Sequence, residues 1–378
     1  MRGIRSQALV LAMLGALLAV TRAEGQSRSW AQPQIERVVA GGLMAPTVAT
    51  FRPNDALLGP ELAQLLPALA PVETTTTTVT ETLPPDTTAT ATTTTDPATT
   101  TTATTPAPAA SGAPITLARL DTSLVRTLGA GAAGTRFARA TRAAGLRPPA
   151  RFGTEVVARL LGLRTNHPAA QDYLELRPQD AITRAETAYS VAQILAFRGS
   201  ELSSVEEASK AIALPVLDPW QQRILQTAVN LIGYPYVWGG TSPGAEAPFG
   251  HQARGGFDCS GFVWQVYKLH AYADEGTLAA TLRGRTTYDM AREVGKAKRV
   301  ALADLQPADV IFFGAAGPLS KPAQVDHMGI YLGGGWFIHS SGYGVALAQI
   351  SGWYAQRFAW ARRPLAEAGL VVPAAPTS

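Results

Sequence analysis

The stretch FDCSGFV, residues 257–263, decides the fold of the C-terminal part of this 378-residue chain. A glycine-rich loop ends here, and a helical pattern runs on from Phe262 to Leu269. One helix that carries the cysteine, followed by an antiparallel sheet, predicts an α+β domain over residues 215–365. The segments expected as strands of this sheet are 309–313, 327–332, 336–339 and 358–362.

Cys259 is the only cysteine of the chain, which excludes an internal disulfide framework and any metal site with several cysteines. At the start of a helix its sulfur lies beside unpaired backbone amides and the positive end of the helix dipole. Both favour the thiolate, which is the nucleophile of covalent catalysis. The position therefore predicts a catalytic cysteine, and an inert buried thiol is the alternative interpretation.

His327 begins one expected strand and His339 ends the next, with three glycines between the two strands. A three-residue hairpin loop places both imidazoles on one face of the sheet, and we expect this face to confront the helix of Cys259. His327 would then take the thiol proton, while His339 would fix the ring of His327. A zinc site made of the same three side chains is the alternative, although no local metal-binding spacing supports it.

The motifs YVWGG (236–240), DCSGFV (258–263), HMGIYLG (327–333) and IH (338–339) resemble the NlpC family of papain-like cell-wall peptidases. The resemblance covers roughly residues 220–364. It implies a papain-like fold and a peptidoglycan hydrolase that needs no cofactor and no metal. It also implies a cut in the stem peptide, typically at γ-D-glutamyl–diaminopimelate. The residues implied are Cys259, His327 and His339 as the catalytic set, and Tyr236, Asp258 and Ser260 as substrate contacts.

The three implied substrate contacts have structural alternatives. Tyr236 could be a packing aromatic, Asp258 a helix cap and Ser260 a residue of the first helical turn. The sequence also departs from the family pattern in the long loop 241–256, which enters the segment just before the nucleophile, and in PAD (307–309), where the family has Pro-Gly-Asp.

An internal repeat marks the N-terminal half. FRPNDALLGPELAQLL (51–66) and LRPQDAITRAETAYSV (176–191) share Arg, Pro, Asp, Ala and Glu at fixed offsets, and a weaker copy begins at Leu146. Arg-Pro prevents helix, Thr183 can cap, and the Glu falls in the first turn, so each copy predicts a loop followed by a helix. FRP (51–53) and TRAE (183–186) resemble S-layer homology repeats. This resemblance implies small all-α regions over 24–71 and 113–214 that bind secondary cell-wall polysaccharide; helical packing units without a ligand are the alternative.

The remaining segments look like export and linker sequence. Residues 1–23 have a basic start, a short apolar run and a small residue at a cleavage point, as in a secretory signal peptide. They hold Arg2, Arg5 and Arg22, which supply three of the four net positive charges. Nucleic acid is therefore an unexpected partner. The Thr/Pro-rich tract 72–112 and the tail 366–378 are expected to be disordered.

Together these features predict a secreted, wall-associated bacterial hydrolase without a membrane-spanning segment in the mature chain. Two alternatives stay open. One is a wall-binding scaffold or activator whose peptidase domain is silent. The other is an amidase or acyltransferase that uses the same Cys-His pair.

Overall fold

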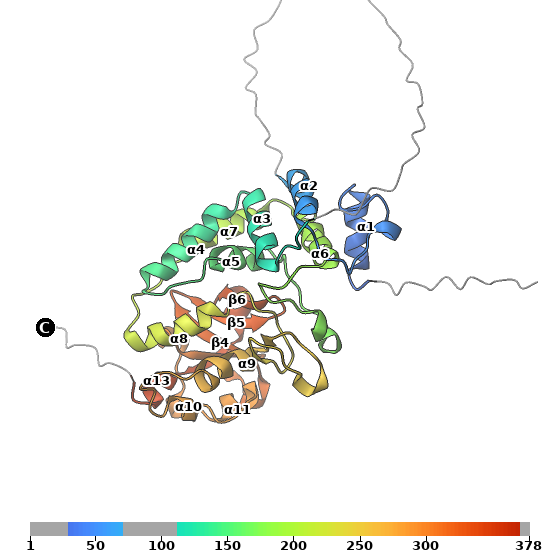
Figure 1. Ribbon diagram of the computed structural model, residues 1–378. Coiled ribbons are helices and arrows are strands. Elements are labelled where there is room, and N and C mark those ends of the chain that lie inside the picture. The colour runs from blue at the N-terminus through green and yellow to red at the C-terminus, as the bar shows by residue number, and fades with distance from the viewer. Residues whose placement is uncertain (1–28, 71–111, 371–378) are drawn as a thin grey trace, which may run out of the picture.

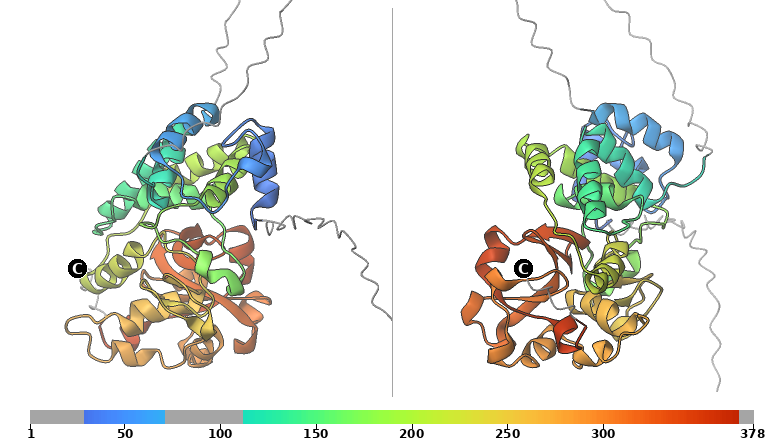
Figure 2. Two further views of the ribbon diagram at one scale, coloured as in Figure 1. Left: turned by 45° about the vertical axis from the view of Figure 1, so that its right-hand side comes forward. Right: turned by 90° about the vertical axis from the view of Figure 1, so that its left-hand side faces the viewer.

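The computed structural model describes residues 29–70 and 112–370 (Figure 1). The expected signal peptide, the linker up to residue 111 and residues 371–378 of the expected tail lie outside these ranges. A helical half sits on an α+β half that contains the sheet (Figure 2). Within the described ranges, no helix has the length and apolarity needed to cross a membrane.

Three short extended segments hold the helical half together. The amide of Leu57 donates to Ile182, Ile182 donates to Ile115, and Ile115 donates back to Leu57, at 2.9, 2.9 and 3.0 Å. All three side chains are buried, so this closed three-way ring is part of the core. Each segment leads directly into a helix, namely α2 (Gly59–Leu69), α3 (Leu117–Thr127) and α6 (Arg184–Ile194).

All three copies of the repeat form a loop followed by a helix, as predicted, and the weaker copy at Leu146 leads into a helix at Phe152–Leu160 with Glu155 in its first turn. The three-way ring joins the copies at 51–66 and 176–191 to a segment outside the repeat, 114–116. Segment 114–116 lacks the Arg-Pro letters of the repeat, and its place is set by backbone hydrogen bonds, which need no particular side chain. The match to S-layer homology repeats remains a prediction.

The two copies also interlock through side chains. Thr183 caps α6 by accepting from the amide of Glu186 at 3.1 Å, as the sequence predicts. Arg184 donates to the carbonyl of Phe51 at 2.7 Å and pairs with Glu61 of the first copy. The other helices of this half are α1 (Gln32–Ala40), α4 (Gly131–Ala143), α5 (Phe152–Leu160) and α7 (Ser200–Ala211), with a short 3₁₀ helix η2 (Ala169–Leu174).

The α+β half contains a five-stranded antiparallel sheet in the order β6-β5-β4-β3-β7. All four expected strands are present, and Ile330 pairs with Ile338 as the hairpin predicts. The strand β6 was not expected from the sequence. The strands are β3 (Val310–Gly314), β4 (Val325–Gly333), β5 (Trp336–Ser341), β6 (Gly344–Gln349) and β7 (Phe358–Arg362), and a separate two-stranded pair joins β1 (Thr241–Ser242) to β2 (Gly256–Phe257).

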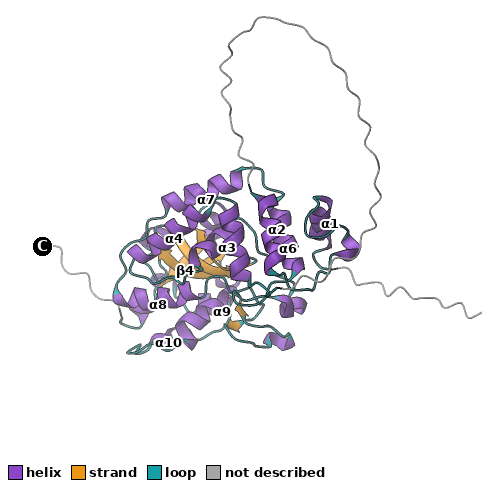
Figure 3. Cartoon of the chain, turned by 45° about the horizontal axis from the view of Figure 1, so that its top comes forward, coloured by secondary structure: helices purple, strands orange, loops and turns teal. Residues whose placement is uncertain are grey.

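Helices cover one face of this sheet (Figure 3). The helices of this half are α8 (Pro219–Asn230), α9 (Cys259–Trp264) with a π-helical extension (Gln265–Leu269), α10 (Leu278–Thr281), α11 (Thr287–Arg292), α12 (Gly352–Arg357) and α13 (Pro364–Glu367). Thus α13 extends into the range expected as tail. The α+β class predicted for residues 215–365 is confirmed.

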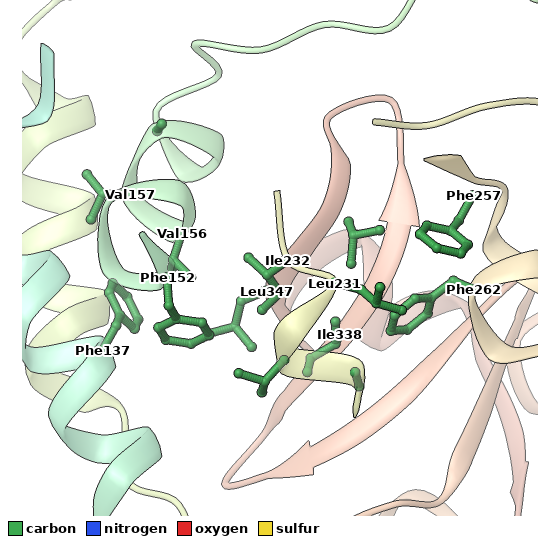
Figure 4. Packing of buried hydrophobic residues seen from close by; sticks show 14 of the residues in the cluster. Phe137, Phe152, Val156, Val157, Leu231, Ile232, Phe257, Phe262, Ile338 and Leu347 are labelled. Atoms are coloured by element: carbon green, nitrogen blue, oxygen red, sulfur yellow. The ribbon is translucent and has the colours of Figure 1, made fainter. Parts of the chain in front are cut away.

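A single hydrophobic core joins the two halves. Phe137 and Phe152 from the helical half point toward Leu347 of β6, while Phe262 of α9 lies near Ile338 of β5 (Figure 4). The ring of Phe137 also meets Trp336 edge-on at 5.5 Å. The helical half is therefore packed directly on the sheet that carries the expected catalytic histidines.

Candidate active site

Cys259 is the first residue of α9, and the residues on either side of it suit the start of a helix. Asp258 is the helix cap, and its carboxylate accepts from the amide of Gly261 in the first turn. A side chain at Gly261 would collide with the carbonyl oxygen of Gly240, so only glycine lets the loop and the helix approach this closely. The expected loop-to-helix transition at the cysteine is confirmed.

His327 and His339 lie side by side on neighbouring strands. Nε2 of His327 and Nδ1 of His339 are 2.7 Å apart, which confirms that both side chains share one face. The pair is enclosed by Phe313, Phe337 and Tyr354, and the ring of Tyr354 lies 5.3 Å from that of His339. This contact fixes the ring of His327 and leaves its Nδ1 nitrogen for another partner.

The histidine face does not confront the helix α9 as expected. The helix packs on the opposite face, where Met328 and Ile338 alternate with the histidines along the strands. The start of the helix nevertheless reaches β4, because the thiol of Cys259 lies beside the backbone amide of Met328, the residue after His327. The thiol of Cys259 thus lies next to the backbone of β4, one residue from His327, although α9 and the two histidines lie on opposite faces of the sheet.

Burial sets the protonation states of these groups. It raises the pKa of Cys259 to about 11, and Asp258 adds to this shift, whereas Thr287 and the amides of Ser260 and Met328 oppose it. The amide at the helix start does favour the thiolate, as expected, but desolvation outweighs it. Burial also lowers the pKa of His327 to about 4, and that of His339 falls well below its usual value. At neutral pH the site holds a neutral thiol and two neutral imidazoles.

Asp258 and Ser260 belong to a polar cluster centred on Arg285. The guanidinium of Arg285 pairs with the carboxylate of Asp258 at 3.3 Å, donates to the hydroxyl of Ser260 at 2.7 Å, and donates to the carbonyl of Gly239 at 2.9 Å. Asp258 also accepts from the amide of Gly239 at 3.0 Å. The cluster holds the loop 236–240 against α9, and the substrate contacts implied for Asp258 and Ser260 remain predictions.

Sequence reasoning missed two residues of the site. Arg285 organises the cluster just described, and the hydroxyl of Thr287 lies 3.5 Å from the sulfur of Cys259. The motif RTT (285–287) was a usable signal, because it resembles a family segment. No local pattern, however, shows that it lies next to a cysteine 28 residues earlier in the chain.

A residue of the helical half lies close to Tyr236 of the α+β half. Burial raises the pKa of its hydroxyl, and negative charge on Cys259, Asp258 and Asp172 adds to the shift. Asp172 comes from η2, is itself buried, and lies beside the backbone amide of Trp238. A residue of the helical half is therefore part of the surroundings of the site. Among the described residues, no three His, Cys, Asp or Glu side chains gather into a group that could hold a metal ion.

Comparison with known proteins agrees with this geometry. The sequence model described as "NlpC/P60 family" matches residues 233–363. A probable endopeptidase of Mycobacterium tuberculosis is 34% identical over 122 residues, which are 32% of this chain and 24% of that protein. The gamma-D-glutamyl-L-lysine dipeptidyl-peptidase of Bacillus subtilis is 32% identical over 117 residues, 31% of each protein. The chain thus spans less than a third of the length of these relatives.

Among solved structures, an NlpC/P60 family protein from Bacillus cereus is 27% identical. The alignment covers 40% of this chain and 42% of that one, with a TM-score of 0.30.

Proposed function

Because residues 233–363 form a domain of the NlpC/P60 family, we propose that the protein is a secreted cysteine endopeptidase that cuts stem-peptide amide bonds of peptidoglycan. The observation that carries this proposal is the hydrogen-bonded pair of His327 and His339 next to the strand position reached by Cys259. The bond proposed is γ-D-glutamyl–diaminopimelate, and the relative from Bacillus subtilis, named for a γ-D-glutamyl bond, supports it.

Because Cys259 and His327 are both neutral before the reaction, His327 can act as a general base toward the thiol. Nδ1 of His327 takes the proton of Cys259 as the sulfur attacks the scissile carbonyl. Backbone amides at the start of α9 stabilise the oxyanion, and one such donor is worth about 2.7–4 kcal/mol. His327 then gives the proton to the leaving amine, and water hydrolyses the thioester. Throughout, His339 holds the imidazole of His327 in one orientation.

The substitution Cys259→Ala tests this mechanism. It removes the nucleophile but leaves the cap, the Arg285 cluster and the core unchanged, so the variant should fold and release no muropeptides from purified peptidoglycan. Chromatography with mass spectrometry measures the products, and thermal unfolding provides the control for folding. Muropeptide release at the wild-type rate would rule out the mechanism. The product masses also separate an endopeptidase from an amidase or acyltransferase.

A second candidate function is wall binding without catalysis. The observation that favours it is the partly buried thiol of Cys259, whose pKa is raised to about 11. Labelling with iodoacetamide distinguishes the two functions. A catalytic Cys259 reacts, and its labelling accelerates with rising pH. A silent domain leaves the thiol unlabelled and yields no new muropeptides.

The helical half suits attachment to the wall. We propose that its repeats bind secondary cell-wall polysaccharide, in line with their resemblance to S-layer homology repeats. A hollow of about 490 Å³ lies beside the loop 51–55 of the first copy and offers the charged groups of Arg52 and Asp55. The expected signal peptide would export the chain to the wall.

A further inference from the structure

Exposed aromatic side chains gather around the candidate active site. Single exposed rings are ordinary on protein surfaces, but a concentration of them marks a binding surface. Among the described residues, the exposed aromatic side chains are Tyr173, Trp238, Phe249, Tyr288, Tyr343 and Trp353.

Three of these residues lie next to groups of the site. Tyr288 directly follows Thr287, whose hydroxyl contacts the sulfur of Cys259. Trp353 meets the ring of Tyr354 edge-on at 5.0 Å, and Tyr354 packs against both histidines. Tyr343 lines a small cavity together with Tyr236.

The other three rings lie on segments that meet beside Tyr236, and we call them the aromatic rim: Tyr173, Trp238 and Phe249. They are 55%, 57% and 78% exposed, so each ring offers more than half of its surface to a ligand. The helical half supplies Tyr173, and the loop that follows Tyr236 supplies the other two. Asp172 joins the two parts, because it precedes Tyr173 and lies beside the amide of Trp238.

Phe249 is held in place at a structural cost. Its backbone has a φ of 50°, in the left-handed region that residues other than glycine rarely adopt. Its ring lies against Gly239, where any side chain would collide with it. Strained backbone of this kind persists at functional sites, where the surroundings hold it. The long loop 241–256 thus presents an aromatic ring beside the site.

The chemistry of the rim fits a sugar better than a peptide. Polar groups accompany the rings, since the buried Asp172 lies beside the amide of Trp238 and near His251. A protein partner would need a continuous apolar centre instead. A pyranose ring has a flat C–H face that stacks on an aromatic ring and hydroxyl groups at its edge. Stem peptides are small, aliphatic and charged, and they offer no flat face.

We propose that the aromatic rim binds the glycan strand to which the stem peptide is attached. This inference rests on the proposed function, and it specifies the substrate as glycan-linked peptide rather than free peptide. The strand would pass over Tyr173, Trp238 and Phe249 while its peptide enters the site at Cys259.

Binding can be tested without catalysis. In the Cys259→Ala background, calorimetry with peptide-free glycan strands compares Tyr173→Ala/Phe249→Ala with the matched control Tyr173→Phe/Phe249→Tyr, which keeps both rings. We expect the alanine pair to weaken binding at least about tenfold and the control to change it less than about twofold. Equal affinity of both double variants, or no binding by the Cys259→Ala parent, would overturn the proposal. Thermal unfolding shows that both variants are folded.

Kinetics then separate this proposal from the proposed function. In the active enzyme, the alanine pair should raise KM for a disaccharide-linked peptide about tenfold and leave KM for the free stem peptide unchanged. An equal effect on both substrates would contradict glycan recognition. If the wild type cuts neither substrate yet binds the glycan through the rings, the hydrolase proposal fails while the rim remains a glycan site.

Discussion

Cys259 and His327 both lack charge at pH 7, because burial raises the pKa of the thiol to about 11 and lowers that of the imidazole to about 4. A preformed thiolate–imidazolium pair would need the opposite order of the two values. In the proposed mechanism the proton moves only when the sulfur attacks, and His327 acts as a free base, the form that predominates at pH values above its pKa of about 4.

This order of pKa values predicts an unusually flat pH profile. In the proposed mechanism the reactive form has neutral His327 and protonated Cys259, and it predominates from about pH 5 to about pH 10, one unit inside the two pKa values. We expect kcat/KM of the cleavage of a synthetic stem peptide to vary less than about twofold between pH 6 and pH 9. A bell-shaped profile with a limb near pH 7 would show that the free enzyme holds an ion pair instead.

At the scale of elements, the site requires helix α9 to pack in close contact with the loop 236–240. A methyl group at Gly261 would collide with the carbonyl oxygen of Gly240 and with Arg285. Gly261→Ala should therefore push the helix away, lower the free energy of unfolding by about 1–3 kcal/mol and reduce activity. Gly131→Ala is the matched control, because nothing lies near that position. Equal unfolding free energies for the two variants would contradict this packing.

Some elements are marked by a pattern in their own sequence, whereas others are specified only by the segments with which they pair. The strand β4 and the helix α9 were predictable, since β-type residues and helical spacing mark them directly. The strand β6 was missed because its sequence, GVALAQ, has few β-branched residues and is specified by pairing with β5. Segment 114–116 was missed for a similar reason, because only its partners in the three-way ring identify it.

For the candidate site, sequence reasoning predicted the helix start at Cys259 and the shared face of the two histidines, but not the protonation states of these groups. Burial decides those states, and burial depends on the whole fold. Asp172 shows the same limit. It is 87 residues before Cys259, and nothing around it indicates that η2 reaches the loop of Tyr236.

At the scale of the whole molecule, one buried histidine connects three parts of the helical half. His167 lies 3.2 Å from Glu175 at the end of η2 and 3.2 Å from Glu186 of α6, and Trp30 meets its ring edge-on. Despite burial, these two carboxylates raise the pKa of His167 to about 9. The charged imidazole thus holds η2, and with it Asp172, in position over the site.

His167→Asn should destabilise the protein in a pH-dependent manner. Because the folded pKa of about 9 exceeds the ordinary value of 6.5, the stabilisation is complete below pH 6.5 and is lost as the pH rises through 9. We expect a loss of about 3 kcal/mol at pH 6 and a smaller loss at pH 9.5, measured by denaturant unfolding. His270→Asn, at an exposed position, serves as the control. A loss that stays constant with pH would contradict a charged His167.

The three-way ring has a consequence for the Thr/Pro-rich tract. Leu58, just before α2, is bridged to Pro114, just after the tract, so the chain re-enters the helical half beside the start of α2. The tract cannot set the distance between a wall-bound part and a catalytic part, because the residues on either side of it pack into one shared core. A protease that nicked it would leave the two pieces held together by the core that they share.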